Sequence, residues 1–144
     1  MKLVDANVLI YAVNDADARH EQSRAWLDTA LVGTETVGFT WIVVLAFLRL
    51  TTRTGLFPNP LTVAEADDRV RSWLAAPAAV TVEPTARHFE VLAGLLAESG
   101  TGGNLVSDAH LAALAAEHDA TIVTFDRDFA RFDGVASQPP EMRA

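Results

Sequence analysis

The sequence predicts an α/β fold in which one domain, spanning residues 1–144, has a central parallel sheet of about four to five strands with helices on both faces. Three observations support this prediction. Short apolar runs that suit buried strands alternate along the chain with helical patterns. A length of 144 residues is that of one domain with a core of its own. Half of the residues are apolar and 21% are charged, which is typical of a globular protein.

The N-terminal segment predicts one strand and two helices. Leu3-Val4 has the character of a short buried strand, and it turns directly into a short helix at residues 8–13. Asp15 and Asp17 then open an amphipathic helix, because acidic residues are favoured in a first helical turn. Gly33 marks the end of this helix, since glycine is the residue that most often follows a helix C-terminus.

The next segment predicts a second strand and two further helices. Residues 36–40 form the strand, and a very apolar helix at residues 41–52 follows it directly. Thr62 and Glu65 have the spacing of a capping box, in which each side chain satisfies a backbone N–H of the first turn. The helix that they start runs to the residue before Pro77, which cannot continue it.

The C-terminal part continues the alternation of strands and helices. A third strand is expected at residues 80–82, and a helix begins at Thr85 and stops at Gly100. An alanine- and leucine-rich helix spans residues 104–118, and the fourth strand follows shortly after it at residues 121–124. The remainder of the chain is expected to add a short final strand.

Composition limits the classes of function. The chain has no cysteine, which excludes disulfides, thiolate metal ligands and a cysteine nucleophile, and which fits a reducing cytoplasm. We expect neither a signal peptide nor a membrane-spanning segment, because Asp5 and Asn7 interrupt the N-terminal apolar run. The net charge of -8 argues against broad electrostatic adhesion to nucleic acid, although a local site remains compatible with it.

Acidic residues follow the first and the fourth predicted strands. Asp5 comes directly after Leu3-Val4, and Asp126 and Asp128 come shortly after the fourth strand. Residues just past the carboxyl ends of parallel strands line the ligand crevice of an open α/β sheet. Like charges gathered there are costly unless protons or a cation neutralise them. The pattern therefore suggests a site for a hard divalent metal ion.

Asp108 is the third candidate ligand, near the start of a mostly apolar helix. By itself it is better explained as a helix cap or a salt-bridge partner, but together with Asp5 and Asp126 it favours a metal site. Asn104 lies one turn earlier on the same face and could support Asp108 or a metal-bound water. A set of oxygen ligands without cysteine predicts Mg²⁺, with Mn²⁺ as a possible substitute, rather than zinc.

Further polar residues are expected to support this site. Asp126, which is closer to the strand end than Asp128, is the better direct ligand, and the other aspartate would bind through water or cap a short helix. Asn7 is expected to cap the first helix and to make a supporting polar contact, because asparagine is a good N-cap. Thr124 can donate a supporting hydrogen bond at the same corner.

Three segments resemble the acidic motifs of PIN-domain ribonucleases: Val4-Asp5-Ala6-Asn7-Val8-Leu9-Ile10, Ser107-Asp108-Ala109 and Val123-Thr124-Phe125-Asp126-Arg127-Asp128-Phe129. Each motif alone is weak, but three in this order make the resemblance fairly specific, and it covers nearly the full length. It extends to the VapC toxins of type II toxin–antitoxin systems, especially the mycobacterial type with Gly103-Asn104-Leu105-Val106. The resemblance implies Mg²⁺-dependent endoribonuclease activity on an RNA substrate, a cognate antitoxin that blocks the site, and a homodimer.

The sequence departs from the family pattern at one position. PIN domains usually carry a glutamate in the helix after the second strand, and alignment with this chain puts Ala46 there. Asp128 could compensate for the missing carboxylate, and Glu35 is a more distant candidate. The departure leaves the number of metal ions, one or two, open.

The expected reaction is hydrolysis of RNA phosphodiesters, in which a metal ion activates a water that Asp126 or Asp128 helps to position or deprotonate. Two alternatives remain from the sequence. One is a weak or inactive PIN-like protein-interaction module. The other is an aspartate-nucleophile phosphatase, which fits less well because Asn7 replaces the second aspartate and Lys2 is the only lysine. No aromatic stacking platform stands out, so the sequence does not indicate the RNA target or the cleavage sequence.

Overall fold

A five-stranded parallel sheet forms the centre of the computed structural model, which describes residues 1–55, 58–100, 102–103 and 105–142. The strands run in the spatial order β3-β2-β1-β4-β5. Their bounds are β1 (Lys2–Val4), β2 (Val37–Phe39), β3 (Ala79–Thr81), β4 (Thr121–Val123) and β5 (Ser137–Gln138). The α/β fold and the strand number expected from the sequence are confirmed, including the short final strand.

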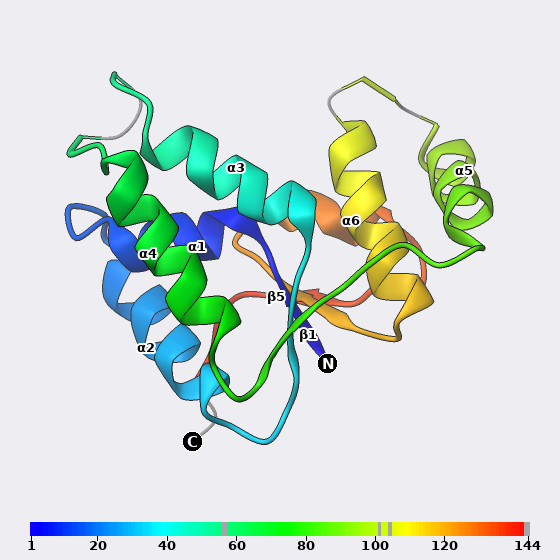
Figure 1. Cartoon of the computed structure of the whole chain (residues 1–144). Coiled ribbons are helices and arrows are strands. Elements are labelled where there is room, and N and C mark those ends of the chain that lie inside the picture. Colours follow the sequence, from blue (N-terminus) through cyan, green and yellow to red (C-terminus); the bar gives the residue numbers. More distant parts are fainter. Residues whose placement is uncertain (56–57, 101, 104, 143–144) are drawn as a thin grey trace.

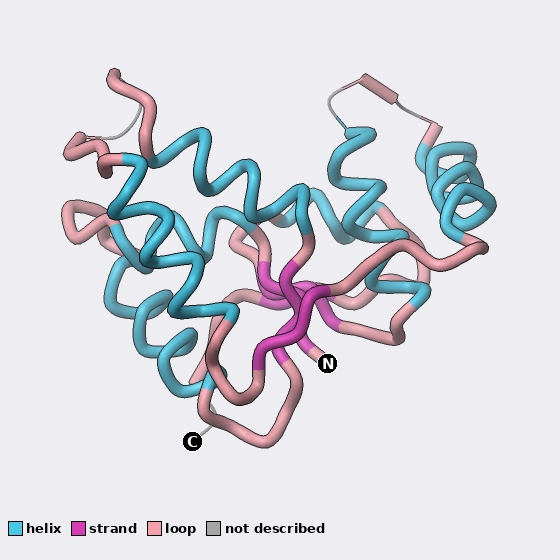
Figure 2. The backbone as a smooth tube through the Cα atoms, in the orientation of Figure 1, coloured by secondary structure: helices cyan, strands magenta, loops and turns pink. Residues whose placement is uncertain are grey.

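Within the described residues, six α-helices and one 3₁₀ helix accompany the sheet. Figure 1 and Figure 2 show how they are arranged around it. They are α1 (Ala6–Val13), α2 (His20–Leu31), α3 (Trp41–Thr51), α4 (Val63–Leu74), α5 (His88–Ser99), α6 (Leu105–Glu117) and the 3₁₀ helix η1 (Arg127–Arg131). Helix α1 packs against α2 and α3, and α3 also packs against α4. Helices α5 and α6 pack against each other on the other side of the sheet (Figure 1).

The neighbouring strands β1 and β4 are covered on both faces. The side chains of Leu3, Val4, Ile122 and Val123 are fully buried, whichever face of the sheet they point to. A parallel sheet with helices on both sides buries alternate residues equally, so its strands read as continuous apolar runs instead of alternating patterns. This is why such short strands were recognisable in the sequence.

Most local signals in the sequence are obeyed, but three helix starts differ from the prediction: α1 begins two residues earlier, at Ala6, and α2 and α5 begin later, at His20 and His88. The capping box is formed, because Glu65 N–H donates to Thr62 Oγ1 over 3.1 Å and Thr62 N–H donates to Glu65 Oε1 over 3.0 Å. Helix α2, however, begins only at His20. Asp17 Oδ1 accepts a hydrogen bond from Arg19 N–H over 2.8 Å, and this local turn competes with a helix in the preceding residues.

Helices α5 and α6 are connected by a series of partly buried polar side chains that bond to one another. His88 lies between Glu117 and His110, and its Nε2 is 2.8 Å from His110 Nδ1. Burial raises the pKa of the Glu117 carboxyl, but hydrogen bonds from Thr85 and His88 outweigh this effect and leave the pKa below its ordinary value. His110 therefore contacts the neighbouring helix α5 through its ring.

No helix within the described ranges has both the length and the apolar character that crossing a bilayer requires.

The strand order defines where a ligand would bind. From β1 the chain continues outward to β2 and β3 on one side, whereas β4 and β5 lie on the other. The carboxyl ends of β1 and β4 therefore flank the topological switch point, which is the usual ligand crevice of an open parallel sheet.

Candidate active site

The carboxyl ends of β1 and β4 lie side by side. Val4 is in register with Val123, and Asp5 N–H donates to the Val123 carbonyl oxygen over 3.0 Å. Asp5 and Thr124 are the first residues beyond their strands. The two chain corners that the sequence singled out, 119 residues apart, are thus brought together by the register of the sheet.

Thr124 is the centre of a hydrogen-bond network at this corner. Its side chain is buried, and its Oγ1 donates to Asp5 Oδ2 over 2.7 Å. The same oxygen accepts hydrogen bonds from Asn7 Nδ2 (3.1 Å) and from Asp126 N–H (3.0 Å). Asn7 also donates to Asp5 Oδ2 over 3.3 Å, and its Oδ1 accepts from Phe125 N–H over 3.1 Å. The network fixes Asp5 and the loop that carries Asp126.

Asp5, and not Asn7, caps helix α1. Asp5 has extended backbone angles and its Oδ1 accepts from Ala6 N–H over 2.7 Å, whereas Asn7 lies inside the helix. The predicted cap at Asn7 was wrong because the helix begins two residues earlier than expected. The predicted supporting contact of Asn7 is present, in its bonds to Asp5 and Thr124.

Asp108 lies in the first turn of α6 and is half-buried. The pKa of its carboxyl is raised to about 6, first by burial and then by the negative charges of Asp126, Asp5 and Asp128, while Arg131 has the opposite effect. Within the described chain no residue donates a hydrogen bond to this carboxyl. Its ionised form therefore lacks local support and would be stabilised by a cation.

The same electrostatics act on Asp5. Burial raises the pKa of the Asp5 carboxyl, hydrogen bonds from Thr124 and Ala6 lower it, and the charge of Asp126 raises it again, with a net upward shift. Burial and the negative charge of Asp126 thus raise the pKa of both Asp5 and Asp108. Perturbed carboxyl groups that gather in a crevice are a common property of functional sites.

Asp126 and Asp128 have different positions. Asp126 caps η1, because its Oδ1 accepts from Asp128 N–H over 2.8 Å. The side chain of Asp128 is 59% exposed and lies 3.5 Å from Arg131. Asp128 therefore stands at the rim, and the short helix is capped by Asp126. Sequence reasoning overlooked Arg131, whose spacing of three residues from Asp128 was the available signal.

The donor set fits a divalent ion that keeps part of its water shell. In the part of the chain that the structure describes, no three His, Cys, Asp or Glu side chains are close enough to form a complete metal cage. Mg²⁺, however, is usually bound through one or two carboxylates, with waters and substrate phosphates as its other ligands. Asp126 Oδ2 and the Asp108 carboxyl accept no hydrogen bond from the described residues, so these oxygens are open to such an ion.

Three other positions remain from the sequence analysis: Asn104, Ala46 and Glu35. Asn104 falls outside the described residues. Ala46 is half-buried in α3, a helix without an acidic residue. Glu35 cannot replace the missing glutamate, because it lies at the amino end of β1, 3.5 Å from the N-terminal amine and 3.9 Å from Lys2 Nζ. Asp5 is at the opposite end of that strand, so this alternative was wrong.

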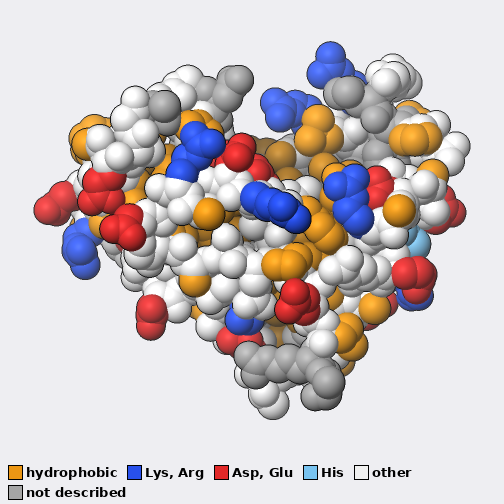
Figure 3. Space-filling view, turned by 180° about the vertical axis from the view of Figure 1, so that it is seen from behind, with side chains coloured by type: hydrophobic (Ala, Val, Ile, Leu, Met, Phe, Trp, Pro, Cys, Tyr) orange, Lys and Arg blue, Asp and Glu red, His pale blue; other side chains and the backbone are white. Residues whose placement is uncertain are grey.

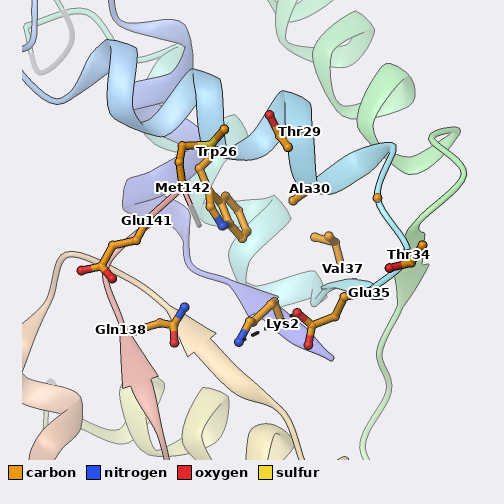
Figure 4. Close-up of a pocket in the computed structure, with 11 residues that line it drawn as sticks. Lys2, Trp26, Thr29, Ala30, Thr34, Glu35, Val37, Gln138, Glu141 and Met142 are labelled. Carbon is orange, nitrogen blue, oxygen red and sulfur yellow. Dashed lines mark ion pairs between the residues drawn. The ribbon is translucent and has the colours of Figure 1, made fainter. Parts of the chain in front are cut away.

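A pocket of about 460 Å³ lies beside α2, away from the acidic corner (Figure 4). Lys2, Trp26, Glu35 and Glu141 line it together with Gln138, and Lys2 and Glu35 pair with each other (Figure 4). It contains none of the candidate aspartates. The face seen in Figure 3 carries separate arginine or lysine side chains among acidic and apolar ones, without a continuous basic surface. This agrees with the net charge of -8.

The chain was compared with known proteins. The family model described as "PIN domain" matches residues 2–135. Ribonuclease VapC37 from Mycobacterium tuberculosis is 57% identical over 143 residues, which cover 99% of each chain.

Two solved structures share the fold. VapBC2 from Rickettsia felis, solved bound to a DNA fragment from its promoter, has a TM-score of 0.72 at 17% identity and covers 97% of this chain and 98% of that chain. VapC20 from Mycobacterium tuberculosis, described as a sarcin-ricin loop cleaving toxin, has a TM-score of 0.70 at 18% identity and covers 96% and 100%. The resemblance noted in the three acidic motifs is confirmed, and the chain belongs to the PIN domain family.

Proposed function

We propose that this protein is a divalent-metal-dependent endoribonuclease that acts as the toxin of a type II toxin–antitoxin system. Asp5 and Asp126, which the Thr124 hydroxyl brings together at the switch point of the sheet, carry this proposal with Asp108, whose pKa is raised by burial and by the charges of both. The relatives named ribonuclease VapC support the reaction class and the substrate class. The metal ion is Mg²⁺, for which Mn²⁺ substitutes, because all of the candidate ligands are carboxylate oxygens.

Asp5, Asp108 and Asp126 would hold the ion, directly or through water. When bound, it supplies Lewis-acid stabilisation of the charge that builds up on the scissile phosphate and lowers the pKa of a bound water. One ion is enough for this, and α3, where other family members carry a glutamate, offers no acidic residue for a second.

The residues of the chain orient the reaction. Thr124 holds Asp5 through its Oδ2, and Asn7 ties Asp5 to the backbone of the loop after β4. The pKa of Asp108 is raised to about 6 in the metal-free protein, and a bound cation would favour its ionised, ligating form. Asp126, or Asp128 at the exposed rim, would position or deprotonate the attacking water.

The partner chains follow from the same family relationship. VapBC complexes among the solved structures support an antitoxin that covers the acidic crevice. We infer a homodimer from the surface of α3, where Trp41 and Leu45 are 52% and 61% exposed one helical turn apart.

Cleavage of total RNA by the purified protein tests the function. We expect cleavage with Mg²⁺ or Mn²⁺, none in excess chelator, and a loss of more than about 100-fold for Asp5→Asn and Asp108→Asn. Asp67→Asn is the matched control, because Asp67 pairs with Arg71 on the surface of α4. Expression of the wild type should arrest growth, and expression of the two site variants should not. Full activity of Asp5→Asn would refute the proposed site, whereas absence of metal-dependent cleavage by the wild type would refute the ribonuclease function and leave a PIN-like interaction module.

A further inference from the structure

A cluster of two aromatic rings and a guanidinium adjoins the acidic corner. The rings of Tyr11 and Phe125 meet edge to face, with centroids 5.4 Å apart. Arg19 Cζ lies 3.9 Å from the centroid of the Tyr11 ring and 5.7 Å from that of Phe125. These groups come from α1, from the turn before α2 and from the loop after β4. Tyr11 and Phe125 are half-buried, and the side chain of Arg19 is 46% exposed, so the cluster faces solvent.

The cluster is fixed to the residues proposed to hold the metal ion. Phe125 stands between Thr124 and Asp126, and its N–H donates to Asn7 Oδ1. Tyr11 is on the same helix that Asp5 caps. A nucleotide whose phosphate lies at the aspartates would therefore have its base within reach of this surface.

The arginine in the cluster is held in place and neutralised. Arg19 Nε and Nη2 donate to the two carboxylate oxygens of Asp17 over 3.0 and 3.1 Å. This pair of hydrogen bonds fixes the plane of the guanidinium over Tyr11, so a base that stacks on it orders the side chain at little further entropic cost. Because Asp17 offsets its charge, Arg19 is suited to stacking rather than to attracting a phosphate. Aromatic rings and guanidinium planes are the surfaces on which proteins stack unpaired nucleobases.

Resting on the proposed ribonuclease function, we propose that Tyr11, Arg19 and Phe125 form a stacking platform that binds an unpaired nucleobase next to the cleaved phosphate of the RNA substrate. The platform selects single-stranded or looped RNA, because a base inside a duplex cannot reach it. Stacking also gives this acidic protein a means of holding RNA that does not depend on a basic surface.

Titration with adenosine tests the platform without any cleavage. In metal-free protein followed by amide NMR, adenosine should shift the signals of Phe125 and its neighbours, and ribose at equal concentration should not. Phe125→Leu and Arg19→Lys should each weaken adenosine binding about 10-fold, in line with the worth of one stacked base. Arg19→Lys keeps the positive charge and removes the planar guanidinium, so it separates stacking from charge attraction. Phe89→Leu is the matched control, since Phe89 on α5 is 77% exposed.

RNA cleavage kinetics give a second readout. Phe125→Leu should raise KM about 10-fold and change kcat less than about 2-fold. A ring that served only to position the Asp126 loop would instead lower kcat. The platform is refuted if adenosine shifts no signals near Phe125, or if Arg19→Lys and Phe125→Leu bind it as the wild type does. Adenosine binding by a protein that cleaves no RNA would refute the ribonuclease proposal alone, so the two failures are distinguishable.

Discussion

Thr124 donates its hydroxyl hydrogen to Asp5 Oδ2 over 2.7 Å, across 119 residues of sequence. The bond connects the residues that directly follow the neighbouring strands β1 and β4. Since the same hydroxyl oxygen accepts from Asn7 and from the backbone of Asp126, one buried group orients both corners of the candidate site. Residues that orient metal ligands in this way commonly affect affinity and activity almost as much as the ligands do.

Thr124→Val should therefore weaken metal-dependent cleavage by about 10- to 100-fold. Valine has nearly the same shape, but it leaves Asp5 Oδ2, Asn7 Nδ2 and the Asp126 N–H without their common partner. Each buried polar group left unsatisfied costs about 1–3 kcal/mol, so the free energy of unfolding should also fall by at least that amount. Cleavage rates and denaturant unfolding measure the two effects.

Thr124→Ser is the matched control for this change. It keeps the hydroxyl and removes one methyl group, so cleavage should stay within a few-fold of the wild type. If serine and valine reduced cleavage equally, the methyl group and not the hydrogen bonds would account for the loss.

Divalent metal ions should raise the thermal stability of the protein. Repulsion between Asp5, Asp108 and Asp126 is relieved by a bound cation, and a ligand tenfold above its Kd adds about 1.4 kcal/mol. For a domain of this size the expected rise in Tm is about 4 °C. Scanning calorimetry with Mg²⁺, Mn²⁺ or chelator measures it.

The rise in Tm should disappear in Asp5→Asn and remain in Asp67→Asn, which removes an exposed carboxylate of α4. An equal rise in both variants would mean that the ion binds elsewhere on this acidic surface.

Sequence patterns predicted the fold and the main acidic residues for a physical reason. The strands are buried on both faces, and residues that follow the carboxyl ends of parallel strands must meet at one edge of the sheet. Asp5 and Asp126 follow from this rule with no knowledge of side-chain contacts. Asp108 needed the combination with Asp5 and Asp126, because a carboxylate in a first helical turn is by itself equally well explained as helix stabilisation.

Contacts between distant side chains were not predictable in the same way. Phe125 is far from Tyr11 and Arg19 in sequence, and no spacing rule connects the three residues, so the sequence did not predict the aromatic cluster. The cap of α1 was misassigned because aspartate and asparagine are equally good N-caps, and only the backbone angles decide between Asp5 and Asn7. Glu35 was plausible only while its end of the strand was unknown.

Leu45→Glu should disrupt the proposed homodimer. Leu45 is 61% exposed on α3, next to the exposed ring of Trp41, so a charge there costs the monomer little but would be desolvated in an interface. Light scattering after size-exclusion chromatography should give twice the chain mass for the wild type and the chain mass for the variant. Val63→Glu, at an exposed residue of α4, is the control and should remain a dimer. A dimeric Leu45→Glu would remove α3 from the interface.

Asp108→Asn should stabilise the metal-free protein above pH 6 and not at pH 4. The pKa of Asp108 is raised from 3.8 to about 6 by burial and then by the neighbouring carboxylates, so between these values the folded state binds a proton that the unfolded state has released. Stability from this group is thus present at low pH and is lost as the pH rises through about 6. Asparagine cannot ionise and avoids the loss. The full shift corresponds to about 3 kcal/mol, but Asp108 is partly exposed and screened, so we expect a gain of about 1–2 kcal/mol. Denaturant unfolding in chelator from pH 4 to pH 8 measures it, and a difference between variant and wild type that stays constant over this range would contradict the proposed repulsion.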